Sequence, residues 1–302
     1  MKNRSHGIKK GPDEVAFSII SYLLVAVFAV CCFLPFYLIL VGSFTDEKWI
    51  LQKGYTFFLT GENFSLGGYK TVFETPETIL SAYGVTVFVT VVGTLLSVLI
   101  TTMAGYVISR KSFPWRNGFA FFFFFTTLFS GGLIPWYLMC TKVLAFKNHI
   151  YALIIPGLFS VWNMIISKNF MKSVPDELEE SAKIDGASPF QIYTKIMVPV
   201  SKPLIATLCL FTALGYWNDW YNCMLFISDS RLYNLQFTLQ NILTSIEKIS
   251  EIASKSGIQM AALPSEGLKM AMTVVTVGPI ILLYPFLQKY FVKGLTIGAV
   301  KG

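Results

Sequence analysis

Six long apolar blocks dominate the 302-residue chain and restrict the folds it can adopt. A helix needs roughly 20 apolar residues, at about 1.5 Å each, to cross the hydrocarbon core of a bilayer. The blocks run approximately over residues 17–41, 81–108, 118–140, 150–166, 203–227 and 271–291. The sequence therefore predicts an all-α, multi-pass membrane protein with six transmembrane helices.

Composition supports lipid as the solvent for much of the surface. The chain is 54% hydrophobic and 14% charged, whereas soluble domains carry about a quarter charged residues. The first block is longer than the apolar core of a signal peptide and has no A-x-A-like cleavage site after it, so we expect a retained helix. The net charge of +7 is spread over many loops, which argues against a nucleic-acid partner and for membrane lipid.

The distribution of Lys and Arg predicts the orientation, because these residues favour cytoplasmic loops. With both termini cytoplasmic, the inner loops span about 109–117 and 167–202, and the outer loops about 42–80, 141–149 and 228–270. This choice places most of the 24 basic residues inside, namely Lys2, Arg4, Lys9, Lys10, Arg110, Lys111, Arg116, Lys168, Lys172, Lys183, Lys195, Lys202, Lys289, Lys293 and Lys301. We thus predict an N-tail at 1–15, a transmembrane domain at 16–292 and a C-tail at 293–302.

The sequence predicts neither catalytic nor metal-binding residues. The five cysteines form no C-x-x-C pair, and the spacing of His6 and His149 does not suggest a metal site. The string G-x-x-x-x-G-K-[ST], whose amides hold phosphates in P-loop ATPases, does not occur. The chain is therefore not expected to be an enzyme or to bind ATP. Apolar spacing over 235–252 predicts a helix in the third outer loop.

The most informative local sequence lies in the second inner loop, at 174–199. Pro175 suits the first position of a helix. Four acidic residues follow it, at the helix end where the dipole favours negative charge: Asp176, Glu177, Glu179 and Glu180. Gly186 can adopt the positive φ that ends a helix. Ser188 and Gln191 make a capping box, with Pro189 opening a second helix. A helix–turn–helix is predicted, which on these residues alone fits a rigid knob or an ordinary amphipathic loop equally well.

This loop resembles the EAA loop of ABC importer permeases. The resemblance is carried by Glu180, Ser181, Ala182, Asp185, Gly186, Ala187, Ile196, Met197, Val198 and Pro199. Ser181 stands where the family pattern has alanine, and Val198 where it has leucine; both replacements are conservative. In the family this loop is a cytoplasmic coupling helix that seats in a cleft of the ATPase subunit. The resemblance therefore implies ATPase coupling by Glu180, Ser181, Ala182, Asp185, Gly186, Ala187, Ile196 and Pro199.

Most of the chain is similar to carbohydrate-uptake permeases of the type I importer fold. Further matching stretches are 34–36, 43–45, 217–219 and the ending at 290–302. The resemblance implies a bacterial inner-membrane subunit working with a second homologous permease as a heterodimer. It also implies two ATPase subunits that bind ATP and Mg, and an external solute-binding protein. The implied cargo is a glycan, with alginate- or pectin-derived chains as candidates. By the same resemblance, 298–302 would reach the ATPases.

The fifth apolar block is interrupted by polar and aromatic residues. The segment reads Trp217, Asn218, Asp219, Trp220, Tyr221 and Asn222. A charged group at bilayer depth is costly, so Asp219 should face protein or a watery cavity. Aromatic faces beside amides and a carboxylate suit the C–H faces and hydroxyl edges of sugars, which predicts a substrate pathway. The alternative for Trp220 and Tyr221 is an aromatic belt at the membrane interface.

Two other functions stay open at this point. A secondary transporter driven by an ion gradient would need paired acidic residues across several spans, whereas Asp219 is nearly alone in its block. A scaffold or sensor subunit that transports nothing would be expected to purify without an ATPase.

Overall fold

The computed structural model describes residues 11–256 and 266–299, which are almost entirely helical. Within these ranges, isolated β pairing is limited to a bridge between Thr45 and Phe64. The predicted all-α fold is confirmed. The predicted tails at 1–15 and 293–302 lie partly outside the described residues. By its internal contacts the chain divides into an N-terminal unit, within 1–74 and 258–274, and a main unit, within 75–257 and 275–302.

The N-terminal unit is built from three helices and the start of a fourth. They are α1 (Pro12–Ser43), α2 (Glu47–Lys53), α3 (Gly67–Val72) and the first turns of α14 (Glu266–Ala299). The Glu47 carboxylate accepts hydrogen bonds from the amides of Glu266 (3.1 Å) and Gly267 (2.8 Å). These amides belong to the first turn of α14 and have no partner within the helix, so Glu47 caps it.

Helix α1 is apolar along its length, and almost none of its surface is buried by other parts of the chain. Its buried residues are the last three, Val41, Gly42 and Ser43. A soluble helix would hide one apolar stripe, whereas a helix that is apolar all round needs lipid or other membrane helices around it. Helix α1 therefore fits the first predicted span.

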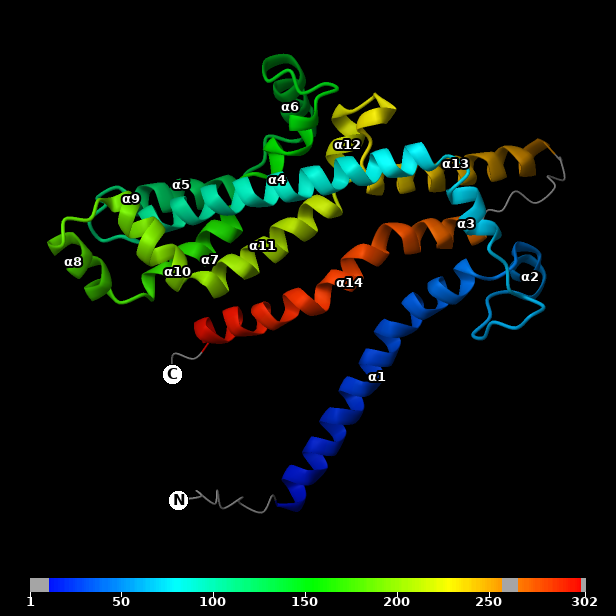
Figure 1. The fold of residues 1–302 in the computed structure, drawn as a ribbon, viewed down its shortest axis with the longest axis horizontal. Coiled ribbons are helices and arrows are strands. Elements are labelled where there is room, and N and C mark those ends of the chain that lie inside the picture. The colour runs from blue at the N-terminus through cyan, green and yellow to red at the C-terminus, as the bar shows by residue number, and fades with distance from the viewer. Residues whose placement is uncertain (1–10, 257–265, 300–302) are drawn as a thin grey trace. The chain divides into compact units, whose positions relative to one another are not determined.

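The main unit is organised around α4 (Pro76–Ser109), which packs against α7 (Val161–Lys172) and α11 (Lys202–Trp217). Figure 1 shows these helices side by side, with α5 (Arg116–Leu128) along the same bundle. Small residues allow the close approach. A Cβ on Gly93 would overlap the Tyr216 ring, and one on Gly105 would overlap Ser167.

Several predicted spans are bent rather than straight. Among the described residues, α1 and α4 are each long and apolar enough to cross a bilayer, and three bent helix pairs raise the total to at most five. The sharpest bend, 112°, separates α5 from the segment 133–143, where the sequence predicts one helix over 118–140. Gly132, directly before α6 (Leu133–Leu138), has φ 87°, a conformation outside the right-handed helix that glycine adopts readily. The sixth apolar block lies within α14.

The broken segments of the main unit are short helical pieces. The first two bent pairs contain α6 (Leu133–Leu138), η1 (Met139–Val143), η2 (Ile150–Leu153) and η3 (Ile155–Gly157). The predicted helix–turn–helix comprises α8 (Asp176–Ile184), α9 (Pro189–Ile192), η4 (Tyr193–Met197) and α10 (Val198–Val200). After α11 come α12 (Tyr221–Phe226), η5 (Ser230–Leu232) and α13 (Leu235–Ser256). Helix α13 confirms the helix predicted in the third outer loop.

Two buried clusters hold the main unit together. One surrounds Phe146, Tyr216 and Phe226, near α12 and η2. The other surrounds Met171, Ile192 and further buried residues where α9 and η4 meet α4 and α11. Figure 1 places α8 and α9 near the C-terminal end of α4. The predicted coupling loop is thus tied to one end of the bundle.

Candidate functional site

The predicted coupling loop folds as its local chemistry indicates. Helix α8 begins at Asp176 with Pro175 as its N-cap, one position from the first helical position predicted for this proline. Gly186 has φ 78° and turns the chain. The capping box of Ser188 and Gln191 is formed in both directions, at 3.3 Å and 2.8 Å, and Pro189 opens α9.

The exposed face of this loop combines acidic and large apolar side chains. Ile184 is 86% exposed and Phe190 64% exposed. Neither was predicted from the sequence, although an apolar residue beside the Asp185–Gly186 turn is a usable signal. The predicted coupling residues differ in their exposure. Ala182 is buried, Ala187 and Ile196 are half-buried, and the other five are exposed: Glu180, Ser181, Asp185, Gly186 and Pro199.

The inner face of the loop is packed onto the bundle. Ile192 and Met197 are fully or almost fully buried, and they join Ala182 in a cluster that includes residues of α4 and α11. The hydroxyls of Tyr193 and Thr102 lie 2.8 Å apart, which adds a polar link to α4. The loop is therefore a firmly seated projection and not a loose connection.

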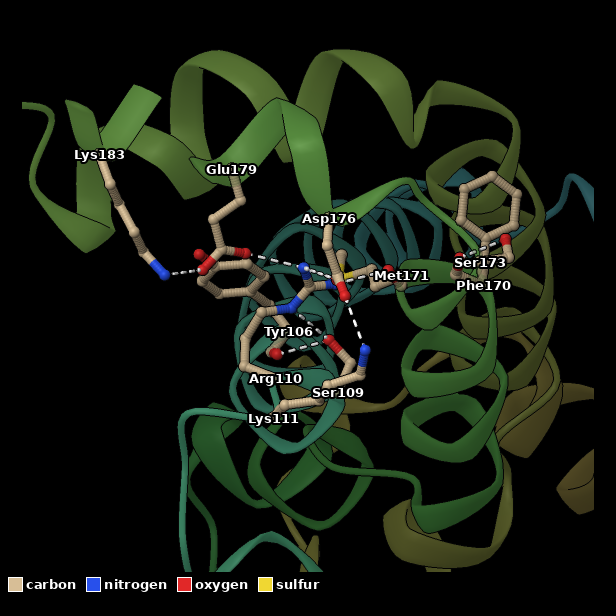
Figure 2. Close-up of polar contacts among 10 residues, drawn as sticks. All are labelled: Tyr106, Ser109, Arg110, Lys111, Phe170, Met171, Ser173, Asp176, Glu179 and Lys183. Atoms are coloured by element: carbon tan, nitrogen blue, oxygen red, sulfur yellow. Dashed lines mark hydrogen bonds and ion pairs between the residues drawn. The ribbon is translucent and has the colours of Figure 1, made fainter. Parts of the chain in front are cut away.

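A buried ion pair joins the projection to the start of the loop between α4 and α5. Arg110 and Glu179 are 8% and 7% exposed, and the Arg110 Nη1 to Glu179 Oε2 distance is 2.7 Å. Figure 2 shows the guanidinium between α8 and the end of α4. Arg110 also donates to the Met171 carbonyl (2.5 Å) and to Ser109 Oγ (2.9 Å), and it lies 5.2 Å from the Tyr106 ring centre.

Exposed charges surround this buried pair. Lys183 bonds the second Glu179 oxygen at 2.8 Å, and Lys111 bonds Asp176 at 2.9 Å. The hydrogen bond from Lys111, together with its charge, lowers the pKa of the Asp176 carboxyl. The side chains enclose a pocket of about 230 Å³. From the sequence, Arg110 is expected on the cytoplasmic side and Glu179 at the start of a helix, where the dipole favours an acidic residue. Their pairing has no sequence signal, because 69 positions separate them.

A second feature is a cavity of about 540 Å³ in the main unit. Its lining comes from the segment before and within α7 and from the end of α11 onward: Gly157, Ser160, Trp162, Asn163, Phe211, Thr212, Gly215, Tyr216, Asp219 and Asn222. Two of the six predicted pathway residues, Asp219 and Asn222, are in this set. The break between α11 and α12 brings them to the cavity.

The cavity combines hydrogen-bonding groups with an exposed aromatic face. Asp219 accepts hydrogen bonds from the Asn222 amide (3.1 Å) and side chain (2.7 Å). Asn163 donates to Thr212 Oγ1 at 3.4 Å, and Trp162 is 69% exposed. Asn163, Thr212 and Trp162 are not among the residues predicted from the sequence, although a polar residue inside an apolar block is a usable signal for the first two. The polar groups of this lining can hydrogen-bond the hydroxyls of a ligand, and the Trp162 ring can pack against the ligand's C–H face.

The other four predicted pathway residues have different surroundings. Trp217 is 5% exposed and donates through Nε1 to the Thr276 carbonyl at 3.2 Å. Asn218 donates to the Leu214 carbonyl and accepts from Gln236. Trp220 and Tyr221 are partly exposed, with their rings edge to face at 5.9 Å. Their placement fits a wall of the path or an interfacial belt.

Comparisons with known proteins agree with one another. A family model described as binding-protein-dependent transport system inner membrane component matches residues 97–297. The Bacillus subtilis protein LplC is 40% identical over 299 residues, covering 98% of each chain. The polygalacturonan/rhamnogalacturonan transport system permease protein YtcP of the same organism is 38% identical, covering 95% of this chain and 98% of its own.

A solved structure is also similar along nearly the whole chain. It is a crystal structure of a bacterial ABC transporter involved in the import of the acidic polysaccharide alginate. The matched chain is 25% identical, the TM-score is 0.81, and the match covers 94% of this chain and 99% of that one. The similarity confirms the importer-permease fold predicted from the sequence.

Proposed function

This chain belongs to the family of binding-protein-dependent transport system inner membrane components, and on that premise we propose that residues 174–199 receive mechanical work from separate ATPase subunits. The chain is a permease subunit of an ABC importer for oligosaccharides or polysaccharides, and ATP hydrolysis resides in another subunit. Partners of the family's general kind, namely a permease, an ATPase and a binding protein, follow from membership.

The coupling assignment depends mainly on the exposed apolar side chains of Ile184 and Phe190, which we call the tip of the 174–199 loop. Ile184 and Phe190 project from a loop whose inner face is firmly packed. Large apolar side chains exposed together on a loop mark a contact surface for another protein. Glu180 and Asp185 border the tip, so the matching cleft of the ATPase should be apolar with a basic rim. We place ATP and Mg in that partner.

The finer assembly is a heterodimer of this chain with a second, homologous permease, served by two ATPases and an external solute-binding protein. Helix α1 is exposed along almost its whole length, which supports contact with lipid and with the second permease. The basic inner loops support termini on the cytoplasmic side.

The cargo assigned here is a glycan derived from pectin-like or alginate-like chains. Support comes from the polysaccharides that two similar transporters import and from the cavity, which Trp162, Asp219 and Asn222 line together. ATP binding would draw the ATPase pair together, move the coupling loops and open the cavity outward, as a two-state rigid-body switch.

Uptake by the complete transporter in proteoliposomes tests this function. We expect uptake of labelled oligogalacturonides that requires ATP and the binding protein and persists when ion gradients are collapsed by ionophores. Ile184→Asp should abolish uptake and weaken retention of the ATPase during purification, because it puts a charge into an apolar contact. Uptake driven by an ion gradient without ATP would contradict the proposal, as would full ATPase retention in Ile184→Asp.

A further inference from the structure

Arg110 contacts three helices at once. It directly follows α4, its Nη1 binds Glu179 of α8, and its Nη2 binds the carbonyl of Met171 in the last turn of α7. A carbonyl at a helix end lacks a partner within the helix, so Arg110 also caps α7. Figure 2 shows the contacts with Glu179 and Met171 converging on the guanidinium.

Helix α8 has little else to hold it against the bundle. Its nine residues are all described, and the buried ones are Glu179 and Ala182. Ala182 offers a single methyl group, which carries small packing energy. Glu179 uses Oε2 for Arg110 and Oε1 for Lys183. A push on the exposed side of α8 can therefore reach α4 and α7 through the Glu179 carboxylate at 2.7 Å, with the half-exposed Asp176 carboxylate at 4.0 Å as a weaker second contact of Arg110.

The burial of the pair makes this contact stiff. Breaking it would leave a charge without its partner in a water-poor site, which is far more costly than breaking an exposed pair. The guanidinium is also fixed in orientation by Ser109 Oγ and by the Tyr106 ring. The neighbouring Lys111–Asp176 pair is exposed at both ends, 76% and 53%, and pairs of that kind add little.

We propose that Arg110 and Glu179 are positioning residues that make α8, α4 and α7 move as one rigid body when the ATPase displaces α8. This inference rests on the proposed function, because it requires an ATPase pressing on α8. It adds a path for the displacement: through the first inner loop into the central helix α4, in parallel with the direct chain connection through α9, η4, α10 and α11.

Transport stoichiometry in the complete transporter tests the pair. The double variant Arg110→Met/Glu179→Leu removes both charges together, so no buried charge is left unpaired and assembly should persist. We expect basal ATPase activity and ATPase retention to stay near wild type, while solute imported per ATP falls by about tenfold or more, a typical scale for coupling between sites. Glu179→Gln keeps a hydrogen-bonding oxygen but leaves the Arg110 charge without its carboxylate, so the same ratio should fall, and retention of the ATPase during purification checks that this variant still assembles.

The matched control is Lys111→Gln, which removes the exposed pair from the same loop. It should keep solute per ATP within about twofold of wild type. Wild-type stoichiometry in both Glu179→Gln and the double variant would overturn the proposal.

A distance measurement tests whether the Arg110–Glu179 pair makes α8 and α4 move together or only stabilises the fold. Spin labels on exposed Glu177→Cys and Ser112→Cys, with Cys31 and Cys32 replaced by serine, report the position of α8 relative to the end of α4. We expect one distance that is unchanged between nucleotide-free and ATP-trapped transporter, and a shift between the two states in the double variant. A shift in the transporter with Arg110 and Glu179 intact would refute the rigid body. Absence of ATP-dependent uptake in the parent preparation would instead show that the proposed function itself has failed.

Discussion

Gly186 occupies a backbone conformation that most residues avoid. Its φ is 78°, and a Cβ built there would meet no atom within 4 Å. A substitution is therefore penalised by backbone strain of about 1–2 kcal/mol and not by a clash. Gly186→Val should shift the loop and abolish solute-stimulated ATPase activity while the chain still inserts into the membrane.

Gly186→Asn is the matched control, because asparagine tolerates the left-handed region. It should retain most of the stimulated ATPase activity measured with the reconstituted transporter. Equal stimulation in the Val and Asn variants would remove the turn geometry from the coupling argument.

Asp219 is the acidic member of the described cavity lining and accepts two hydrogen bonds from Asn222. Asp219→Asn can accept only one of them and brings its own amide donor against the Asn222 amide. We expect the apparent KM for uptake to rise about tenfold, the scale of hydrogen bonds to a charged group. Gel filtration should show normal assembly.

Asp229→Asn provides the comparison for the cavity assignment, because its carboxylate pairs with Arg231 in an exposed turn. Its KM should stay near wild type. A KM that is unaltered in Asp219→Asn would reduce this residue to a structural role.

Individual residues are predictable from sequence where the cause is local. The Gly186 turn and the Ser188 capping box depend on neighbours within a few positions, and both form as expected. The Arg110–Glu179 pair and the Asn163–Thr212 bond join distant positions. Nothing in the local chemistry of either partner indicates the other.

At the scale of elements, α4 depends on small residues at its contacts. A Cβ on Gly105 would overlap Ser167 of α7, whereas one on Gly84 of the same helix would meet nothing within 4 Å. Gly105→Ala should therefore destabilise the bundle by about 1–3 kcal/mol through overpacking. Gly84→Ala should be neutral or slightly stabilising, because alanine is the better helix former.

Thermal unfolding of the purified transporter in detergent measures this difference. The midpoint should fall for Gly105→Ala and stay constant or rise for Gly84→Ala. A fall of equal size in both variants would mean that helix flexibility, and not the contact with α7, decides the outcome.

Apolar blocks predict where helices lie but not where they bend. The 112° bend after α5 lies within the block predicted as one helix over 118–140, whereas the 83° break between α10 and α11 falls where the sequence already predicts the start of the fifth block. Glycines and prolines mark such places ambiguously, since Pro35 lies inside the long helix α1, whereas Gly132 lies at the bend, directly before α6. The direction of a bend depends on packing partners that are distant in sequence.

At the scale of the molecule, the cavity exists because two separate segments meet. Ser160, Trp162 and Asn163 come from the start of α7, and Thr212, Asp219 and Asn222 from the end of α11 onward. One of the two segments, the interrupted fifth block, could be predicted from the sequence, because a carboxylate within an apolar block stands out. The other segment required the packing of α7 against α11.

The cavity and the 174–199 loop can be tested together by asking from which side of the membrane each is accessible. A two-state permease must expose the cavity to one side at a time. In a variant with Cys31 and Cys32 replaced by serine, Ser160→Cys should react with an impermeant maleimide added inside nucleotide-free vesicles, and with the same reagent added outside once ATP is trapped. Ser188→Cys, on the exposed coupling loop, should react from the inside in both states. Reaction of Ser160→Cys from both sides in one state would mean an open channel. Reaction of Ser188→Cys from the outside would invert the topology, and with it the assignment of residues 174–199 to an ATPase.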